Sequence, residues 1–346
     1  MNNARLRALD DAVLARLPTL VPGFTEVSNV DHRRWTTIIS CATAGPDVIV
    51  KVDRGRGGAP ADTYARLAEI GQILADVERI EAPRAIAWNA DPRMLVMSHV
   101  AGRGVEKIIA RAVSTKRDED LVQAIDAVTL AGEALARLHR GLPTGRDDPR
   151  DVVKLASRFY RVREPSRDRT MMVRNVSDFS TSNLRYNSQE DRPGTLYLLD
   201  PSPSRRRVPA ENDLGYFLMT LMNSTVGCSS VIRRRYALRM YRKLSANFID
   251  SYCCASRLQV GEVLRPEGIG LFAGYRAALW GSRRLRDAPG LRVVALNALW
   301  WSLLTRVGRR SSPWLERGFQ PVAPTVAATD VLPIDRTHRT TSATTP

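Results

Sequence analysis

The sequence is poor in lysine, cysteine and histidine, and it has no long hydrophobic run. Its 52 Lys+Arg residues include only five lysines, so arginine supplies nearly all of the basic charge. Against 36 Asp+Glu residues they leave a formal net charge of +16. This balance favours an anionic partner, namely a phosphate ligand, nucleic acid or an acidic membrane face. Codon bias produces the same arginine excess, so the charge alone assigns no function.

The few cysteines exclude a zinc module and a disulfide scaffold. They are Cys41, Cys228, Cys253 and Cys254, and they form no CxxC pair. We therefore expect reduced thiols in a cytosolic protein. The four histidines are too scattered along the chain to suggest a metal cluster or a catalytic triad.

Nothing in the sequence predicts a membrane-spanning helix. The uncharged segment 293–305 falls short of the ~20 residues that a spanning helix needs. The first residues alternate charged and apolar side chains and offer no secretory signal. We expect a cytoplasmic protein. Peripheral contact with an acidic membrane, through arginine clusters and Trp300-Trp301, stays open beside the alternative of a solvated arginine face.

The first hundred residues have the pattern of a small α/β unit. Residues 35–41 and 48–52 are rich in β-branched side chains and flank a Gly-Pro turn, which predicts a β-hairpin. Apolar residues at helical spacing predict a helix over 62–76. Two further short strands are predicted at 84–88 and 94–100.

Beyond residue 103 the pattern is mainly helical. Helices are predicted over 121–139 and 232–248, and the second carries arginines on one side and apolar residues on the other. Short apolar bursts between polar loops interrupt this pattern at 171–203. The Pro- and Thr-rich segment 320–346 predicts a disordered tail.

The residues that suggest chemistry are one lysine and a group of acids and amides. Asp178 and Asn183 lie five positions apart in a polar loop, and a hydrophobic strand at 196–199 ends in Asp200. A carboxylate at such a strand end can bind Mg²⁺ together with phosphate oxygens. Lys51 lies inside a β-branched strand, where its ammonium must reach solvent or pair with an acid or phosphate. Taken singly, each residue is better explained by a structural role: Asp178 and Asn183 as loop caps, Asp200 in a strand-ending turn, and Lys51 as an exposed edge residue.

Taken together, these motifs resemble the aminoglycoside phosphotransferase-like, or protein-kinase-like, small-molecule kinases. The similarity covers residues 25–250. Its strongest part is the Asp-x4-Asn element followed by a hydrophobic strand that ends in Asp. The supporting parts, in chain order, are Val48–Lys51, the hinge strand Leu95–Gly102, the helix end Leu135–His139, the loop Val176–Asn183 and Asp213-Leu-Gly.

The resemblance implies a bilobal α/β (α+β) fold of the protein-kinase type. Residues 1–100 would form a small N-terminal lobe with an antiparallel sheet, one helix and the hinge. Residues 101–319 would form a larger, mainly helical lobe with the catalytic loop and the acceptor site, and 320–346 the tail.

The resemblance also implies roles for residues of the N-terminal lobe. Lys51 would hold the α- and β-phosphates of ATP, and Glu69 would orient that lysine. Backbone groups around Ser98, His99 and Val100 would meet the adenine.

In the C-terminal lobe, the resemblance implies that Asp178 accepts the proton of the substrate hydroxyl. Asn183 and Asp200 would bind Mg²⁺, and Asp213 would brace the catalytic loop. These parts suit phosphoryl transfer, in which positioning and charge neutralisation supply most of the catalysis.

The sequence departs from the family pattern at the catalytic loop. Val176-Ser177 stands where the family has His-Gly, and Pro201 stands where it often has an aromatic residue. Gly55, Gly57 and Gly58 follow Lys51 instead of preceding it. These departures bear on catalytic efficiency more than on the fold.

We therefore expect ATP- and Mg²⁺-dependent transfer of the γ-phosphoryl group to a hydroxyl of a small molecule, sugar or lipid-linked glycan. An anionic acceptor is one interpretation of the arginine clusters. The alternatives are a degenerate pseudokinase that senses nucleotide and a basic protein that binds an anionic surface. Nucleic-acid binding is disfavoured because no zinc spacing or helix-turn-helix signal accompanies the charge.

Overall fold

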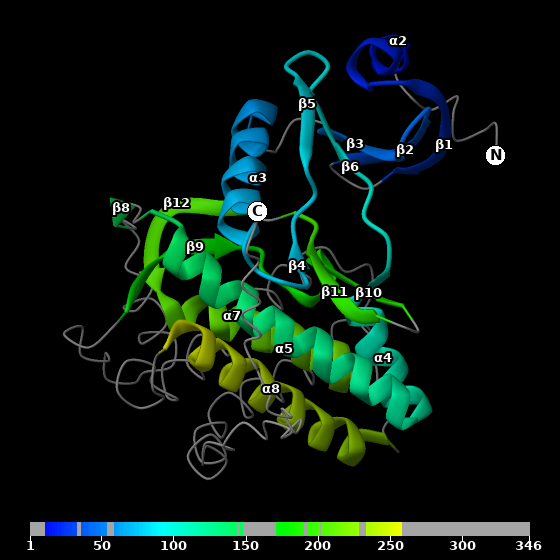
Figure 1. The fold of residues 1–346 in the computed structure, drawn as a ribbon. Coiled ribbons are helices and arrows are strands. Elements are labelled where there is room, and N and C mark those ends of the chain that lie inside the picture. Colours follow the sequence, from blue (N-terminus) through cyan, green and yellow to red (C-terminus); the bar gives the residue numbers. More distant parts are fainter. Residues whose placement is uncertain are drawn as a thin grey trace, which may run out of the picture.

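The computed structural model describes residues 11–32, 36–53, 59–143, 146–147, 171–189, 192–200, 202–227 and 233–257. The chain forms a small lobe built on a sheet, above a larger lobe in which helices α5 and α8 lie side by side (Figure 1). Several sequence-based expectations lie outside the described residues, namely Cys228, the glycines after Lys51, segment 293–305 and the tail 320–346.

The upper lobe contains a five-stranded antiparallel sheet in the order β1-β2-β3-β6-β5. The strands are β1 (Phe24–His32), β2 (Thr36–Thr43), β3 (Val48–Asp53), β5 (Ala85–Asn89) and β6 (Met94–Ser98). Helix α2 (Asp11–Leu20) and helix α3 (Pro60–Leu74) pack against strands of this sheet. The predicted hairpin is confirmed, with Cys41 paired to Val48 and Ile38 to Lys51.

Strict alternation of side chains in β3 explains the position of Lys51. Val48, Val50 and Val52 are buried, whereas Lys51 points to the other face of the strand and is partly exposed. Strand β1 was missed because its buried residues, Val27 and Val30, are three positions apart. Two irregularities in its pairing with β2 break the period of two.

Two short strands connect the lobes. Strand β4 (Ile80–Glu81) pairs with β11 (Arg192–Leu198), and β7 (Arg103–Gly104) pairs with β10 (Leu184–Gln189). Between β6 and β7, Gly102 has φ of +101°, and a Cβ atom there would lie 2.6 Å from the carbonyl oxygen of Tyr186. Only glycine accepts this conformation and this contact without a shift of the backbone.

The lower lobe is more than the helical unit that the sequence predicted. Its helices are α4 (Val105–Thr115), α5 (Asp118–Gly141), α7 (Ala210–Met222) and α8 (Arg234–Ser256). The segment of apolar bursts and polar loops forms strands β9 (Met172–Ser177), β10, β11 and β12 (Ser202–Pro209), and β11 confirms the strand predicted at 196–199. They belong to a sheet ordered β4-β11-β10-β7 and to a sheet ordered β8-β12-β9, where β8 is Arg146–Asp147.

Helices α5 and α8 pack closely because a glycine faces the partner helix. A Cβ atom on Gly132 would lie 2.3 Å from the carbonyl oxygen of Phe248. The hydroxyl of Ser251 donates to the carbonyl of Thr129, 2.7 Å away, across the same interface. Helix α8 extends to Ser256, eight residues beyond the predicted end at 248, because it continues along α5 to Ala255, whose carbonyl accepts from Arg140.

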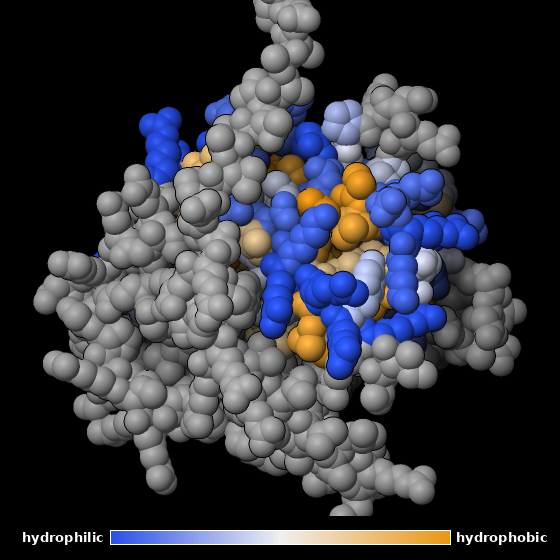
Figure 2. Space-filling view, turned by 90° about the horizontal axis from the view of Figure 1, so that it is seen from below, coloured by the Kyte–Doolittle hydropathy of each residue, from blue (hydrophilic) through white to orange (hydrophobic). Residues whose placement is uncertain are grey.

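The outer face of α8 is basic, as its sequence pattern predicts. Arg235, Arg239, Arg242 and Lys243 are exposed, and none of them makes an ion pair within the described residues. Seen from below, the described surface is rich in hydrophilic side chains with small hydrophobic spots between them (Figure 2). Among the described helices, none is both long and apolar enough to span a membrane.

Burial raises the thiol pKa of two of the described cysteines. Cys41, Cys253 and Cys254 are free thiols. Burial raises the pKa of Cys41 to about 11. The pKa of Cys253 is raised to about 12, mainly by burial and then by the nearby charge of Asp250. Both thiols therefore stay protonated near neutral pH, as expected for structural cysteines.

Candidate active site

The junction of the lobes brings Lys51 and Asp200 into contact. Lys51 Nζ lies 2.6 Å from Asp200 Oδ2, although 149 residues separate them in the sequence. Strand β3 of the upper lobe carries the lysine, and the aspartate follows strand β11 of the lower lobe. The side chains are 24% and 40% exposed, so the pair borders solvent and is open to a ligand.

Asp178 and Asn183 lie in the loop between β9 and β10, where hydrogen bonds join them to the Asp200 segment. The Asn183 amide donates from Nδ2 to the Asp178 carbonyl oxygen, 3.0 Å away. The Leu199 N–H donates to the Asn183 carbonyl oxygen at 2.9 Å. Asp178 is exposed and has φ of 80°, an uncommon value for a residue with a side chain. The predicted acid, amide and strand-end aspartate therefore form one connected unit.

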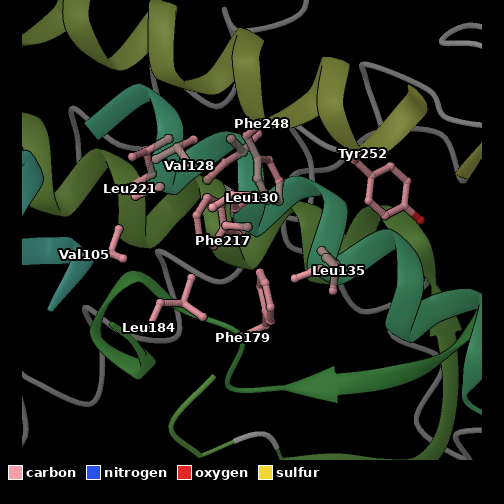
Figure 3. Packing of buried hydrophobic residues seen from close by; sticks show 14 of the residues in the cluster. Val105, Val128, Leu130, Leu135, Phe179, Leu184, Phe217, Leu221, Phe248 and Tyr252 are labelled. Carbon is pink, nitrogen blue, oxygen red and sulfur yellow. The ribbon is translucent and has the colours of Figure 1, made fainter. Parts of the chain in front are cut away.

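The loop between β9 and β10 is anchored by contacts on both sides of Asp178. Val176 is buried, and its N–H donates to Asp213 Oδ2 at 2.7 Å. Phe179 points into the core near Phe217 of α7, with ring centroids 5.6 Å apart (Figure 3). Phe217 in turn stacks on Phe248 of α8 at 4.1 Å. Backbone and apolar contacts thus hold the loop on both sides of Asp178.

Asp213 belongs to a buried hydrogen-bond network, which confirms its expected bracing role. His139 Nε2 lies 3.2 Å from Asp213 Oδ2, and the Asn212 amide donates to Oδ1 at 2.8 Å. The other histidine nitrogen, Nδ1, is 2.8 Å from the Tyr252 hydroxyl. Burial, followed by the charge of Asp213, raises the pKa of Tyr252 well above its ordinary value. Tyr252 therefore remains a protonated phenol at the hydrogen-bond distance from His139.

Glu69 has a different partner from the one expected. Its carboxylate accepts from Arg174 of β9, with Arg174 Nη1 at 3.0 Å from Oε1 and 3.4 Å from Oε2. Lys51 pairs with Asp200 instead. The physical reason is competition, because the guanidinium of Arg174 reaches the carboxylate that Lys51 was expected to contact. The role of Glu69 in orienting Lys51 therefore stays a prediction.

The hinge residues Ser98, His99 and Val100 already make several backbone contacts. The Ser98 N–H donates to the Arg84 carbonyl at 2.9 Å, and the His99 N–H donates to the Asp47 carbonyl at 3.0 Å. The Val100 carbonyl accepts from Arg185 Nη1 at 3.0 Å. Within the described residues, the Val100 N–H has no partner. Of these three backbone N–H groups, that of Val100 is therefore the one whose bond is not made within these ranges.

Two residues near the site were missed by sequence reasoning. Tyr216 of α7 donates its hydroxyl hydrogen to Asp178 Oδ1, 3.0 Å away. Its signal is its place three residues after Asp213, which puts both on one helix face. Arg174 had only a weak signal, as a basic residue in the strand that leads to Asp178.

Comparison with solved structures shows which known proteins have a similar fold. A glucosamine kinase is similar with a TM-score of 0.52 and 14% identity, over 88% of this chain and 83% of that chain. A microcompartment-associated aminopropanol kinase is similar with a TM-score of 0.51 and 13% identity, over 89% and 98%. No family model and no curated protein matches the sequence. The chain therefore has the bilobal fold of the protein-kinase-like small-molecule kinases.

Proposed function

We propose that the protein is an ATP- and Mg²⁺-dependent phosphotransferase that moves the γ-phosphoryl group to a hydroxyl of a small molecule. The observation that carries the proposal is the convergence of Lys51, Asp178, Asn183 and Asp200 at the junction of the lobes. Four chemically appropriate residues from three distant segments meet there, on the fold of small-molecule kinases. The convergence favours catalysis over the pseudokinase and anionic-surface alternatives.

Asp178 is the proposed general base. Its carboxylate belongs to an exposed residue of the loop, so an acceptor hydroxyl can approach it from solvent. As the acceptor oxygen bonds to the γ-phosphorus, the bond from that phosphorus to the ADP oxygen breaks and the hydroxyl proton passes to Asp178. Because transfer of this kind depends mainly on positioning and on neutralising charge, an exposed but anchored carboxylate suits the role.

Asn183 and Asp200 are the proposed magnesium ligands. The Asn183 amide uses Nδ2 to contact the Asp178 carbonyl, which leaves Oδ1 as an oxygen ligand. Asp200 supplies a carboxylate beside solvent. No group of three or more His, Cys, Asp or Glu residues in the described ranges could hold a metal alone. One carboxylate and one amide fit Mg²⁺, which takes its remaining ligands from phosphates and water. When bound, the ion neutralises phosphate charge.

ATP is the proposed phosphoryl donor. Lys51 stands at the same junction, where its ammonium can exchange the Asp200 carboxylate for phosphate oxygens. The N–H of Val100, which has no partner within the described part of the chain, suits a ring nitrogen of adenine, which accepts a hydrogen bond. Both contacts lie on the upper lobe side of the junction.

The acceptor is proposed as a small molecule, a sugar or a lipid-linked glycan, with an anionic acceptor as a narrower class. The exposed cations on α8, Arg235, Arg239 and Arg242, favour peripheral contact with acidic lipid, which would suit a lipid-linked acceptor. The proposed location is therefore the cytoplasm, with part of the protein at a membrane surface.

The proposal is tested by following ADP release and phosphorylated product with a panel of amino sugars, sugars and amino alcohols. Wild-type protein should release ADP only with Mg²⁺ and a suitable acceptor, and Asp178→Asn should not. Binding of ATP without turnover of any acceptor would favour the pseudokinase. Failure to bind ATP at all would overturn the proposed nucleotide site.

A further inference from the structure

One face of helix α7 contacts several successive positions of the loop between β9 and β10. The residues on this face are Asp213, Tyr216, Phe217, Thr220 and, in the π-helical turn η3 (Asn223–Gly227) that continues α7, Ser224. They recur at helical spacing and contact the loop in chain order. Asp213 meets Val176, Tyr216 meets Asp178, and Phe217 meets Phe179. Thr220 Oγ1 accepts from the Thr181 N–H at 3.2 Å, and the Ser224 and Thr181 hydroxyls are 2.9 Å apart.

Within this face, Tyr216 makes the one contact that reaches the carboxylate of Asp178. Its hydroxyl lies 3.0 Å from Oδ1, a normal hydrogen-bond distance. The other contacts hold the backbone or the neighbouring side chains of the loop. Asp178 Oδ2 has no hydrogen bond within the described residues. The two carboxylate oxygens therefore have different surroundings.

We propose that Tyr216 is a positioning residue that fixes the rotation of the Asp178 carboxylate and directs Oδ2 toward the acceptor hydroxyl. This inference rests on the proposed phosphotransfer function. A carboxylate on an exposed loop otherwise rotates about its Cβ–Cγ bond and moves among rotamers. A phenol that donates to Oδ1 holds it in one orientation, and such a charge-assisted bond is stronger than one between neutral groups.

Tyr216 transfers no proton in the proposed reaction. The acceptor O–H bond breaks, its proton goes to Asp178 Oδ2, and its oxygen bonds to the γ-phosphorus as the bond to ADP breaks. The phenol hydrogen stays on Tyr216 throughout. Tyr216 thus acts through Asp178, and its loss should lower the rate of the chemical step without changing nucleotide binding.

The kinetic test is Tyr216→Phe, which removes the hydroxyl and keeps the ring. We expect kcat to fall on the order of tenfold, while KM for ATP and the thermal unfolding temperature stay as in wild type. Tyr236→Phe is the matched control, because Tyr236 lies on α8 and its ring contacts Lys116. An unchanged kcat in Tyr216→Phe, or an equal fall in Tyr236→Phe, would overturn the inference.

A second test needs no turnover and separates this inference from the proposed function. Protein labelled with ¹³C at the tyrosine Cζ atoms gives a Tyr216 resonance, which Tyr216→Phe identifies by its disappearance. We expect this resonance to shift in Asp178→Asn and to stay in place in Asp118→Asn, a change on the exposed start of α5. An unmoved resonance in Asp178→Asn would show that the contact is not made. If the contact is present and no acceptor is phosphorylated, the proposed function fails while the bond itself is established.

Discussion

Lys51 Nζ and Asp200 Oδ2 lie 2.6 Å apart across the junction of the two lobes. A proposed phosphate-binding cation thus lies against a proposed magnesium ligand. Since both side chains border solvent, the pair contributes little to stability and can open at small cost. Binding of a magnesium–nucleotide complex would replace this ion pair by contacts of Lys51 with phosphate oxygens and of Asp200 with Mg²⁺.

The first prediction concerns Asp200. Asp200→Asn should abolish the magnesium-dependent part of ATP binding, because the neutral amide loses the charge that attracts the cation. Calorimetric titration with an ATP analogue, with and without Mg²⁺, measures this effect. Asp53→Asn, at the end of β3 and paired with Arg93, is the control. Magnesium-dependent binding that persists in Asp200→Asn would contradict the ligand assignment.

The second prediction concerns Asp178. Asp178→Ala should lower kcat by roughly 10²- to 10⁴-fold, the usual contribution of a general base, and leave the Kd for ATP nearly unchanged. Rapid-quench measurement of product and calorimetry on the same sample give both quantities. A matching loss of ATP binding would mean that Asp178 is not the base.

The third prediction concerns the competition for Glu69. Arg174→Gln should free Glu69 for Lys51 and tighten ATP binding, whereas Glu69→Gln should weaken it. Each change should amount to about two- to fivefold in Kd, as expected for a partly exposed ion pair. Arg137→Gln removes a surface pair with Glu133 and serves as the control. Equal weakening by both site variants would show that Glu69 acts through Arg174.

The fourth prediction concerns the packing of α5 on α8. Gly132→Ala should destabilise the protein by about 1–3 kcal/mol, the usual penalty for overpacking, because its Cβ atom would lie 2.3 Å from the Phe248 carbonyl oxygen. Gly71→Ala on α3 has nothing within 4 Å of the new atom and should stabilise it, by about 0.5–1 kcal/mol. Denaturant unfolding compares the two variants. Equal effects of the same sign would contradict the close approach of the helices.

The fifth prediction concerns the basic face of α8. If it contacts acidic lipid, the protein should bind vesicles that contain phosphatidylserine, and binding should weaken steeply as salt rises. Replacing Arg235, Arg239 and Arg242 together by Gln should weaken binding roughly 10²-fold, at about 1 kcal/mol for each cation. Vesicles of phosphatidylcholine alone are the control. Binding that salt does not weaken would contradict the membrane contact.

Local patterns predicted much of the upper lobe and the order of the site residues. The hairpin around Lys51 followed from β-branched residues on both sides of a turn, and the order of Asp178, Asn183 and Asp200 resembled the pattern of the kinase-like family. Strand β1 was missed because its irregular pairing removes the alternation on which strand prediction depends. In the lower lobe, the predicted strand at 196–199 corresponds to the end of β11, whereas β10 and β12 were missed. Each of these two strands pairs in part with a segment distant in sequence.

The sequence by itself determined which residue types follow one another on each strand, helix face and loop, because that information lies within a few residues of each position. It placed Lys51 on a strand, and Asp178 and Asn183 in one loop. Tertiary structure alone decided their partners, giving Lys51 to Asp200, Glu69 to Arg174 and Tyr216 to Asp178. Such pairings depend on which charged and polar groups the packed lobes bring within reach, and residues far apart in sequence compete for each of them.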